Sequence, residues 1–524
     1  MGQSQKSQGL TPAVRGREQV VGTKPGYPSP MRGAVAAGHP LTAQAGADVL
    51  AAGGNAVDAA VGAALVSWVA ESPLTGPGSG GFMLVHRARD RSTRVFDFFV
   101  SVPGLGLARR DLGDMDRVDV DFSGGSTQVF HIGAASCAVP GAAVGLEEAH
   151  RSFGKLPWRD LFQPAIELAR NGVELNKGQA YLHAILDLIL RHTPESRAVY
   201  ERNGERLVAE DTLIQADLAN TLELIADQGG KVLYEGDLAE QISDHLRAHG
   251  GCITREDLEN YRVIRRRPVR ANFCGEEYLS NPPPSAGGIL IAYGLPLLEE
   301  LGPGEPGKAE AIDALARVMR EQANARIAAG SVHGLARALE TRAAVVSQGT
   351  THISVVDGKG NAVALTASTG AGSGVVVPGT GIHINNMIGE FDLAKPPRAG
   401  ARLSSMMSPS VVLKDGRPHL VVGSAGSLRL RGSVMQNVVN VVAHNLPVED
   451  AIDRPRVHLE GEDLHCEGGH DPAELDKLEE MGWNVTRWRR QNLYFGGASA
   501  VTFEDGKLAA AGDPRRGGAG VVVE

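Results

Sequence analysis

A predicted β-hairpin at residues 350–368 brings hydroxyl side chains together at its open end. The runs THISVVD and AVALTAS alternate apolar residues as strands do, and GKGN between them reads as the turn. With this turn taken as Gly358–Asn361, Thr350 lies opposite Thr369 and beside Ser368, to within about two residues of register. Threonine and serine are common in strands, so the pattern alone leaves open whether these hydroxyls do chemistry.

A second feature is the sequence HLVVGSAGSLRLRG at 419–432, in which a strand-like run ends in a glycine-rich turn. A helix is predicted to begin near Ser427, directly after Gly426. Backbone N–H groups at such a turn point outward, and the helix dipole adds partial positive charge. The turn therefore suits an oxyanion hole, although an ordinary strand–helix connection has the same pattern.

Two further polar positions admit both a functional and a structural interpretation. Ser404 and Ser405 stand side by side in LSSMM, where paired hydroxyls can hold a carboxylate but more often cap a turn. His352 lies two residues beyond Thr350 on the same face of the predicted strand, about 6–7 Å away. Because buried polar groups are normally paired, we expect His352 to be a hydrogen-bonded structural residue and not a catalytic base.

Small residues dominate the elements that precede these positions. A first helix is expected to be capped by Thr42 and to end at Gly53-Gly54, and a second is expected to be capped by Asn55. The second helix, AVDAAVGAALVSWVA, carries Ala and Val on nearly every face, as a helix buried on all sides does. Residues 76–81 match GxGxxG, but a helix precedes them and a strand follows, which is the inverse of a dinucleotide site.

The rest of the chain divides into a helix-rich first part and a β-rich second part. Residues 155–300 are predicted to be mainly helical, with a capping box at Thr254. Apolar residues recur there at three- and four-residue steps in 183–192, 216–229 and 237–249.

The composition argues against several classes of function. A net charge of −9 argues against a nucleic-acid or anionic-membrane surface, which needs a basic face. The four cysteines are far apart and form no CxxC pair, so we expect no metal site and no cofactor. There is no run of about 18 apolar residues and no visible signal peptide, so we expect a cytoplasmic protein without a membrane span.

Together these motifs resemble the γ-glutamyltransferase family of N-terminal-nucleophile hydrolases. The similarity runs from His39 to the Asp513–Gly517 segment and includes GGNAVDAAV, AVPGAAVGL, FGKLPWRDLFQPAIELA and PPPSAGG. TTHISVVDGKGNAV at 350–363 is similar to the family's cleavage-site motif and is the most specific of these matches.

The resemblance implies a four-layer αββα sandwich, in the α+β class, made as a precursor that cuts itself between Gly349 and Thr350. It predicts an N-terminal arm at 1–32, a large subunit at 33–349 and a small subunit at 350–524, which form one composite domain. The expected partners are a small-molecule amide substrate and the two self-derived subunits, as a heterodimer or a dimer of heterodimers. Cutting makes chemical sense because the new α-amine, with a pKa near ~8, can accept the threonine proton.

The resemblance also implies catalytic roles. Thr350 attacks an amide carbonyl to form an acyl-enzyme, and Ser368 stands where the family has a second threonine that orients the nucleophile. Gly426 and Ser427 supply the N–H groups that hold the oxyanion, with Ser427 replacing a family glycine.

The substrate-binding positions depart from the family pattern. Ser404 and Ser405 match the pair that binds a glutamyl α-carboxylate, but Phe99 stands where the family has an arginine that clamps this carboxylate. Met387 replaces a polar residue, and Glu390 replaces an aspartate. Phe99 and Met387 favour a more apolar acyl pocket, so we expect γ-glutamyl specificity to be weakened or lost.

Three interpretations remain open. The chain is an amide hydrolase or acyltransferase acting on γ-glutamyl compounds such as glutathione, or it acts on another small acyl amide, as relatives resembling cephalosporin acylases or oxamate amidohydrolase do. The third interpretation is a non-catalytic binding protein that keeps the fold and is never cut. Arg429 or Arg431 is a candidate replacement cation, although a charged helix residue is usually just a surface residue.

Overall fold

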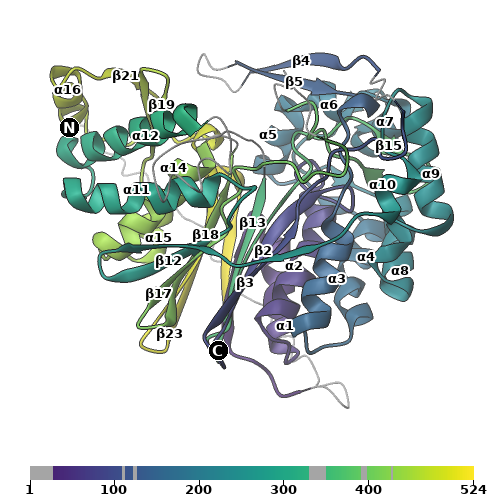
Figure 1. Cartoon of the computed structure of the whole chain (residues 1–524), viewed down its shortest axis with the longest axis horizontal. Helices are drawn as coiled ribbons and strands as arrows, with labels where there is room; N and C mark the ends of the chain where they lie inside the picture. The colour runs from purple at the N-terminus through teal and green to yellow at the C-terminus, as the bar shows by residue number, and fades with distance from the viewer. Residues whose placement is uncertain (1–27, 109–112, 122–126, 330–349, 391–397, 427–428) are drawn as a thin grey trace, which may run out of the picture.

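The computed structural model of the protein describes residues 28–108, 113–121, 127–329, 350–390, 398–426 and 429–524. Two antiparallel β-sheets pack face to face, and helices cover the outer side of each sheet (Figure 1). This αββα sandwich confirms the predicted fold class.

Each of the two sheets joins its strands in antiparallel pairs. The first sheet has the order β10 (Ile264–Arg266), β3 (Ser92–Phe98), β2 (Gly80–Arg87), β14 (Ala362–Ser368), β13 (Thr351–Asp357), β1 (Gly33–Ala37) and β24 (Ala519–Val523). The second has the order β11 (Val269–Phe273), β12 (Glu276–Ser280), β17 (Ser410–Lys414), β18 (Arg417–Ala425), β22 (Gly497–Glu504) and β23 (Lys507–Gly512). β13 packs against β18 and β22, so an apolar core fills the space between the sheets.

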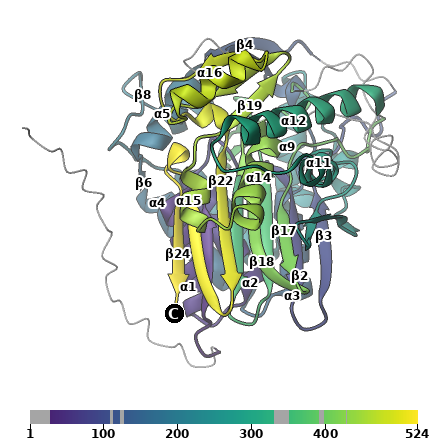
Figure 2. The same ribbon diagram turned by 90° about the vertical axis from the view of Figure 1, so that its left-hand side faces the viewer.

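Helices form the two outer layers. Outside the first sheet lie α1 (Pro40–Ala51), α2 (Ala56–Ala70), α3 (Ala142–Phe153), α4 (Gln163–Asn171) and α8 (Ala216–Gln228). Outside the second lie α11 (Gly287–Leu301), α12 (Ala309–Ala329), α14 (Leu430–Val438) and α15 (Val448–Asp453), which face the viewer in Figure 2.

Shorter elements surround this sandwich. The remaining α-helices are α5 (Lys177–Ile185), α6 (Asp187–Leu190), α7 (Pro194–Tyr200), α9 (Gly236–Ala248), α10 (Arg255–Glu259) and α16 (Pro472–Glu480). The small ribbons pair β4 (Asp116–Asp121) with β5 (Thr127–Ile132), β6 (Val173–Glu174) with β9 (Thr212–Leu213), β7 (Glu201–Arg202) with β8 (Glu205–Arg206), β15 (Val376–Val377) with β16 (Ile382–His383), and β19 (Val457–Glu460) with β20 (Asp463–Cys466) and β21 (Asn484–Arg487).

The first two helices confirm one prediction and correct another. All fifteen residues of α2 are buried, and Asn55 caps the helix through a capping box, as predicted. The N-cap of α1 is His39, whose side chain accepts a backbone hydrogen bond, and not Thr42. Thr42 lies inside the first turn, because its hydroxyl donates to the buried Glu71 carboxylate at 2.8 Å.

The segment 155–300 is less helical than its pattern predicts. The helices expected at 216–229 and 237–249 are present as α8 and α9, and Thr254 forms its capping box. The helix expected at 183–192 is instead split between α5 and α6. The segment also supplies β11 and β12, which the prediction misses because β11 is an edge strand with exposed polar residues and no apolar run.

The β13–β14 hairpin corrects the predicted register by one residue. The Asp357 carboxylate accepts the Asn361 N–H, and the Asp357 N–H donates to the Asn361 carbonyl, each at 3.0 Å. The turn is therefore one residue shorter than predicted. Thr351 pairs with Ala367, and continuing this register by one residue places Thr350 opposite Ser368 instead of Thr369.

Both sheets take strands from either side of residue 350. β1, β2, β3 and β10 of the first sheet and β11 and β12 of the second precede this residue, and the other strands follow it. The two predicted subunits therefore share both sheets and the core between them.

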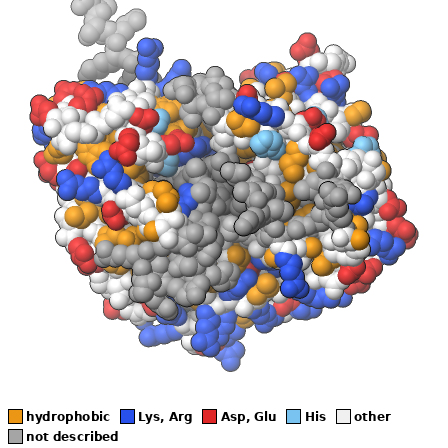
Figure 3. All heavy atoms as spheres, turned by 45° about the horizontal axis from the view of Figure 1, so that its top comes forward, with side chains coloured by type: hydrophobic (Ala, Val, Ile, Leu, Met, Phe, Trp, Pro, Cys, Tyr) orange, Lys and Arg blue, Asp and Glu red, His pale blue; other side chains and the backbone are white. Residues whose placement is uncertain are grey.

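The remaining observations concern the N-terminus and the surface. Residues 1–27 of the predicted arm lie outside the described residues, whereas Met31 is buried and its N–H donates to the Leu50 carbonyl at 2.9 Å. No helix among the described residues is long and apolar enough to cross a bilayer. Acidic and basic side chains are interspersed on the face shown in Figure 3.

Candidate active site

The predicted nucleophile lines a small cavity that is partly open to solvent. Thr350 stands directly before β13 and is 1% exposed. It lines a cavity of about 60 Å³ together with Gly426, Glu390 and Ala371. Apolar side chains form most of the remaining wall, including Leu74, Phe130, Leu182, Leu186 and Leu493. The fold thus brings the predicted nucleophile to two other predicted site residues that are far away in the sequence.

The β13–β14 hairpin buries two polar side chains near Thr350, Ser368 and His352. Ser368 is fully buried opposite Thr350, and its Oγ accepts a backbone N–H at 2.7 Å, while its orienting role stays a prediction. The ring nitrogens of His352 lie 2.7 Å from Thr366 Oγ1 and 3.0 Å from Ser354 Oγ. Burial lowers the pKa of His352 to about 3, so the ring is neutral at physiological pH. The structural interpretation of His352 is confirmed.

The glycine-rich turn after β18 faces the same cavity. Gly426 has a φ angle of 125°, and a Cβ there would lie 2.6 Å from the Cα of Gly496, so only glycine fits. Gly426 follows β18 and precedes α14 in the chain, and it lines the cavity together with Thr350, while its oxyanion role stays a prediction. Ser427 and Gly349, the other predicted residues of this centre, lie outside the described residues.

The predicted serine pair, Ser404 and Ser405, is not among the residues that line the cavity. Ser405 Oγ accepts the Met407 N–H at 3.0 Å, and the Ser405 carbonyl accepts the Ser285 hydroxyl at 3.1 Å. These bonds tie the LSSMM segment to the PPPSAGG segment. Carboxylate binding by Ser404 and Ser405 stays a prediction.

Phe99 and Met387 occupy the core between the two sheets. Both are fully buried, and the Phe99 ring stacks on Phe82 with 5.5 Å between centroids. The Phe99 carbonyl accepts hydrogen bonds from the Tyr261 hydroxyl, at 2.7 Å, and from the Arg402 guanidinium. Neither Phe99 nor Met387 is among the residues that line the cavity. Phe99 therefore provides no cation, and its ring packs in the interior.

Glu390 brings a carboxyl group with an unusual pKa into the cavity. Its Oε1 accepts the Ala371 N–H at 3.0 Å, whereas Oε2 is buried without a hydrogen-bond partner among the described residues. Burial raises the pKa of Glu390 to about 7, since desolvation penalises the charged form and one backbone bond offsets it only in part. The group therefore changes charge near neutral pH.

A second carboxyl group, not predicted from the sequence, holds the strand beside the nucleophile. Glu71 accepts hydrogen bonds from the hydroxyls of Thr351, at 2.5 Å, and of Thr42, at 2.8 Å. It is fully buried, and desolvation raises its pKa. Glu71 thereby fixes the start of β13 to α1, next to Thr350.

Two arginines line the cavity. Arg429, proposed above as a replacement cation, donates from Nε to the Tyr494 carbonyl at 2.9 Å and lies over the Tyr494 ring at 4.3 Å. Arg431, the other candidate, is buried but is not among the lining residues. Arg516 also lines the cavity, and sequence reasoning misses it because its position depends on how the two sheets join.

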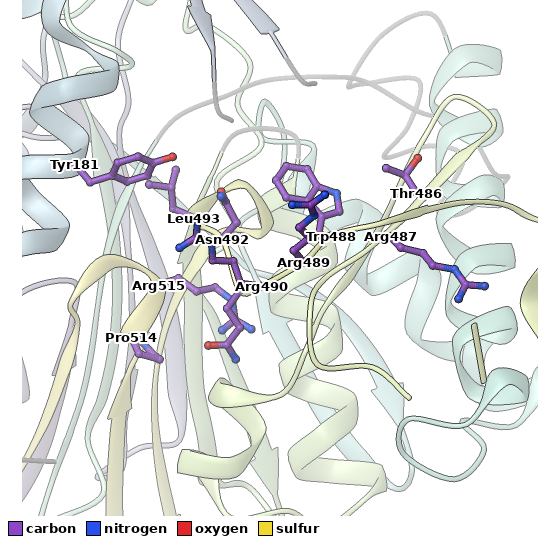
Figure 4. Close-up of a pocket in the computed structure, with 11 residues that line it drawn as sticks. Tyr181, Thr486, Arg487, Trp488, Arg489, Arg490, Asn492, Leu493, Pro514 and Arg515 are labelled. Atoms are coloured by element: carbon purple, nitrogen blue, oxygen red, sulfur yellow. The ribbon is translucent and has the colours of Figure 1, made fainter. Parts of the chain in front are cut away.

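A larger groove of about 690 Å³ lies beside the cavity and shares Leu493 with it. Tyr181, Trp488, Arg489 and Arg490 also line this groove (Figure 4). Arg489 and Arg490 are exposed, so the groove is an open, cationic surface.

Comparison with known proteins decides the family. The family model described as gamma-glutamyltranspeptidase matches residues 42–333 and 312–523. The chain belongs to the gamma-glutamyltranspeptidase family. This membership confirms the resemblance inferred from the motifs around Thr350.

Two relatives illustrate the range of proteins similar to this gamma-glutamyltranspeptidase-family chain. An acylase ACY 1 proenzyme from Pseudomonas sp. (strain V22) is 33% identical, with 94% of both chains covered. A glutathione hydrolase proenzyme from Escherichia coli (strain K12) is 33% identical, with 92% of this chain and 90% of that protein covered. The crystal structure of a cephalosporin acylase from Bacillus halodurans has the same fold, with a TM-score of 0.79 and 24% identity over 98% of this chain and 99% of that chain.

Proposed function

We propose that the chain is a precursor that cuts itself between Gly349 and Thr350 and then hydrolyses or transfers the acyl group of a small amide. The observation that carries this proposal is the shared cavity of Thr350 and Gly426, at the start of β13 and the end of β18. Membership of the gamma-glutamyltranspeptidase family and the proenzyme names of the two relatives support it.

Cutting before Thr350 supplies the base that the hydroxyl otherwise lacks. The freed α-amine takes the Oγ1 proton as Oγ1 attacks the amide carbonyl carbon. The N–H groups of Gly426 and Ser427 hold the oxyanion, and Ser368 orients the hydroxyl. When the C–N bond breaks, the α-ammonium returns its proton to the leaving amine, and an ester on Thr350 remains.

Water or an acceptor amine then releases the acyl group. The α-amine takes a proton from the attacking molecule, and the resulting α-ammonium gives this proton to Thr350 Oγ1 as the ester bond between the acyl carbon and Oγ1 breaks. The acid or a new amide leaves, and the enzyme is regenerated without a redox partner. The two fragments remain a heterodimer because they share both sheets.

Two substrate classes fit this chemistry. A γ-glutamyl compound is suggested by the similarity to a glutathione hydrolase proenzyme, and by Ser404, Ser405 and Glu390. A different acyl amide is suggested by the similarity to an acylase proenzyme, and by Phe99, which provides no cation at the position where the family has an arginine. Comparing turnover of glutathione and γ-glutamyl-p-nitroanilide with that of other acyl amides separates the two classes.

Denaturing gel electrophoresis with N-terminal sequencing tests the proposal. The purified protein is expected to give two fragments, the smaller one beginning Thr350-Thr351-His352. Thr350→Ala is expected to stay full-length and inactive, whereas the matched control Thr350→Ser keeps a hydroxyl and is expected to be cut more slowly. An uncut wild-type chain after long incubation would favour the non-catalytic binding protein.

A further inference from the structure

Glu71 is the C-terminal cap of the buried helix α2, and it is tied to both strands of the hairpin that carries the predicted nucleophile. Its Oε2 accepts the Thr351 hydroxyl at 2.5 Å, so its side chain holds the first residue of β13. Its backbone carbonyl accepts the Leu74 N–H at 2.8 Å. The Leu74 carbonyl in turn accepts the N–H of Thr369, the residue directly after β14, at 2.9 Å. Glu71 therefore fixes the open end of the hairpin, where the predicted nucleophile lies.

The Glu71 carboxylate is held on both oxygens and closely surrounded. The Thr42 hydroxyl donates to Oε1 at 2.8 Å, so one threonine from α1 and one from β13 bind the two oxygens. A Cβ at Gly38 would lie 2.6 Å from Glu71 Oε2 and 3.3 Å from Thr351 Oγ1, so a glycine makes room for this contact. Glu71 and both threonines are buried. The carboxylate therefore determines where the Thr351 side chain lies.

Among the described residues, Glu71 is a buried carboxylate that forms no ion pair within 4 Å. Burial raises its pKa, while the hydroxyls of Thr351 and Thr42 and the charge of Arg516 lower it. A neutral residue could hold β13 at a lower desolvation cost, so the negative charge indicates a positive partner. Cutting before Thr350 creates such a partner, because the new α-amine becomes an α-ammonium each time it takes the hydroxyl proton.

We propose that Glu71 is a positioning residue: through Thr351 it holds the amine and hydroxyl of Thr350 in place, and its negative charge stabilises the α-ammonium. This inference rests on the proposed function, since the amine exists only after the chain is cut. Alternate side chains of a strand point to opposite faces, so Thr351 meets Glu71 while Thr350 lines the cavity. The hydrogen bond and one residue of backbone place the carboxylate within about 10 Å of the amine, where its charge still acts.

Three other charged groups lie near the new amine or near Glu71. Glu390, Arg429 and Arg516 line the cavity together with Thr350. Arg516 is also the charged group whose field acts on Glu71. All three are unchanged in a Glu71 variant, so a change in the pH dependence of that variant reports the loss of the Glu71 charge.

The two threonines that donate to Glu71 give a matched test of the positioning role. Thr351→Val removes the hydroxyl that links Glu71 to β13, and Thr42→Val removes the one that links it to α1. Thr351→Val is expected to be cut at least about tenfold more slowly than wild type, because a small displacement of a nucleophile costs much of its rate. Thr42→Val is expected to stay within about threefold of wild type, and Thr351→Ser, which keeps the hydroxyl, is expected to recover most of the rate. The appearance of the two fragments on a denaturing gel measures these rates without any substrate.

Glu71→Gln separates the charge of this residue from its shape. The amide keeps polar atoms toward both threonines but has no charge. The acidic limb of the pH profile of kcat/KM is expected to move to lower pH by about one unit, because no negative charge then favours the protonated amine. The plateau is expected to fall about threefold or more, because a less basic amine removes the hydroxyl proton less readily. The measurement uses whichever of γ-glutamyl-, glutaryl-, valeryl- and acetyl-p-nitroanilide the wild-type enzyme turns over fastest.

A residue that only supports the fold would not produce these differences. Equal cutting rates for Thr351→Val and Thr42→Val would overturn the positioning role, and an unmoved acidic limb in Glu71→Gln would overturn the role of the charge. Both results would leave the proposed function intact. If Glu71→Gln does not fold, Gly38→Ala replaces it, because its methyl group displaces Glu71 Oε2, and it is expected to slow cutting and to move the acidic limb in the same direction. A wild-type chain that stays uncut forms no new amine and overturns the proposed function together with this inference.

Discussion

The two adjacent arginines of the DPRRG turn occupy opposite electrostatic environments. Arg515 lies 2.5 Å from Glu467 Oε2 and 3.1 Å from Asp513 Oδ1, and Asp513 lies 2.6 Å from Arg456. Although burial opposes it, these carboxylates raise the pKa of Arg515, whereas burial lowers the pKa of Arg516. We call Arg456, Glu467, Asp513 and Arg515 the paired network.

The comparison separates Arg515, which stabilises the fold, from its neighbour Arg516, which lines the cavity. In the paired network, each buried charge has a counter-charge and further hydrogen bonds, so the network holds β22, β23 and the segments around it in place. Among the described residues, Arg516 forms no ion pair within 4 Å, its Nε and Nη1 have no hydrogen-bond partner, and Glu390 leaves one oxygen without a partner. Buried polar groups are normally satisfied, so unsatisfied ones beside the predicted nucleophile are candidates for binding substrate.

Breaking the paired network should cause the largest loss of stability. Arg515→Met leaves the Glu467 carboxylate buried without its cation, which is expected to lower the free energy of unfolding by about 3–5 kcal/mol. Chemical denaturation of the purified variant measures this, with Arg417→Met as a charge-matched control expected to change stability by less than about 0.5 kcal/mol. A loss below about 1 kcal/mol for Arg515→Met would show that the network does not support the fold.

Glu390, which lines the cavity, is expected to make the free energy of unfolding depend on pH, by an amount smaller than the effect of Arg515→Met. The pKa of Glu390 rises from its ordinary value of 4.5 to about 7 on folding, so between these values the folded state holds a proton that the unfolded state has lost. The contribution is therefore fully present below pH 4.5 and is lost as pH rises to 7, by about 1–2 kcal/mol after allowance for solvent at the cavity.

Glu390→Gln cannot ionise and is expected to remove this part of the pH dependence. Unfolding free energies of wild type and Glu390→Gln at several pH values between 4.5 and 7 test it. Parallel curves for the two proteins would contradict the buried, protonated state of Glu390.

Removing the unpaired arginine should have the smallest effect on stability. Arg516→Met replaces a buried charge that forms no ion pair within 4 Å among the described residues by an apolar side chain, so the free energy of unfolding is expected to change by no more than about 1 kcal/mol, in either direction. Denaturation alongside Arg515→Met compares two neighbouring, chemically identical substitutions. A loss as large as that of Arg515→Met would assign Arg516 to the fold and remove the contrast between the two.

The elements that could be predicted are those whose signals are local. The all-buried pattern of α2 and its Asn55 cap, the helical periodicity of α8 and α9 and the hairpin at residue 350 each depend on nearby residues. The details that could not be predicted depend on contacts with residues far away in the sequence or on one hydrogen bond inside a turn. Thr42 was expected to cap α1, but its hydroxyl donates to Glu71. The hairpin register depends on the Asp357 side chain, which accepts a hydrogen bond inside the turn.

Only those site residues that belong to recognisable sequence motifs could be predicted. Thr350, Gly426 and Glu390, named from motifs, meet in one cavity. Arg516 and the wall from α5 could not be placed, because they approach Thr350 only through the junction of the sheets and the packing of a broken helix. The sequence shows that Phe99 replaces the family's arginine, but the packing of its ring against Phe82 depends on the tertiary core.

In both sheets, strands from before residue 350 pair with strands from after it, and this pairing determines whether the two fragments of a cut molecule stay together. The seams β2–β14, β13–β1, β1–β24 and β12–β17 each join a strand from before residue 350 to one from after it. Separation would break these four seams at once and leave an unpaired strand edge on both sides of each, so dilution alone should not part the fragments. Maturation is then a one-way event whose product lasts as long as the whole fold, and its activity per mole does not depend on protein concentration.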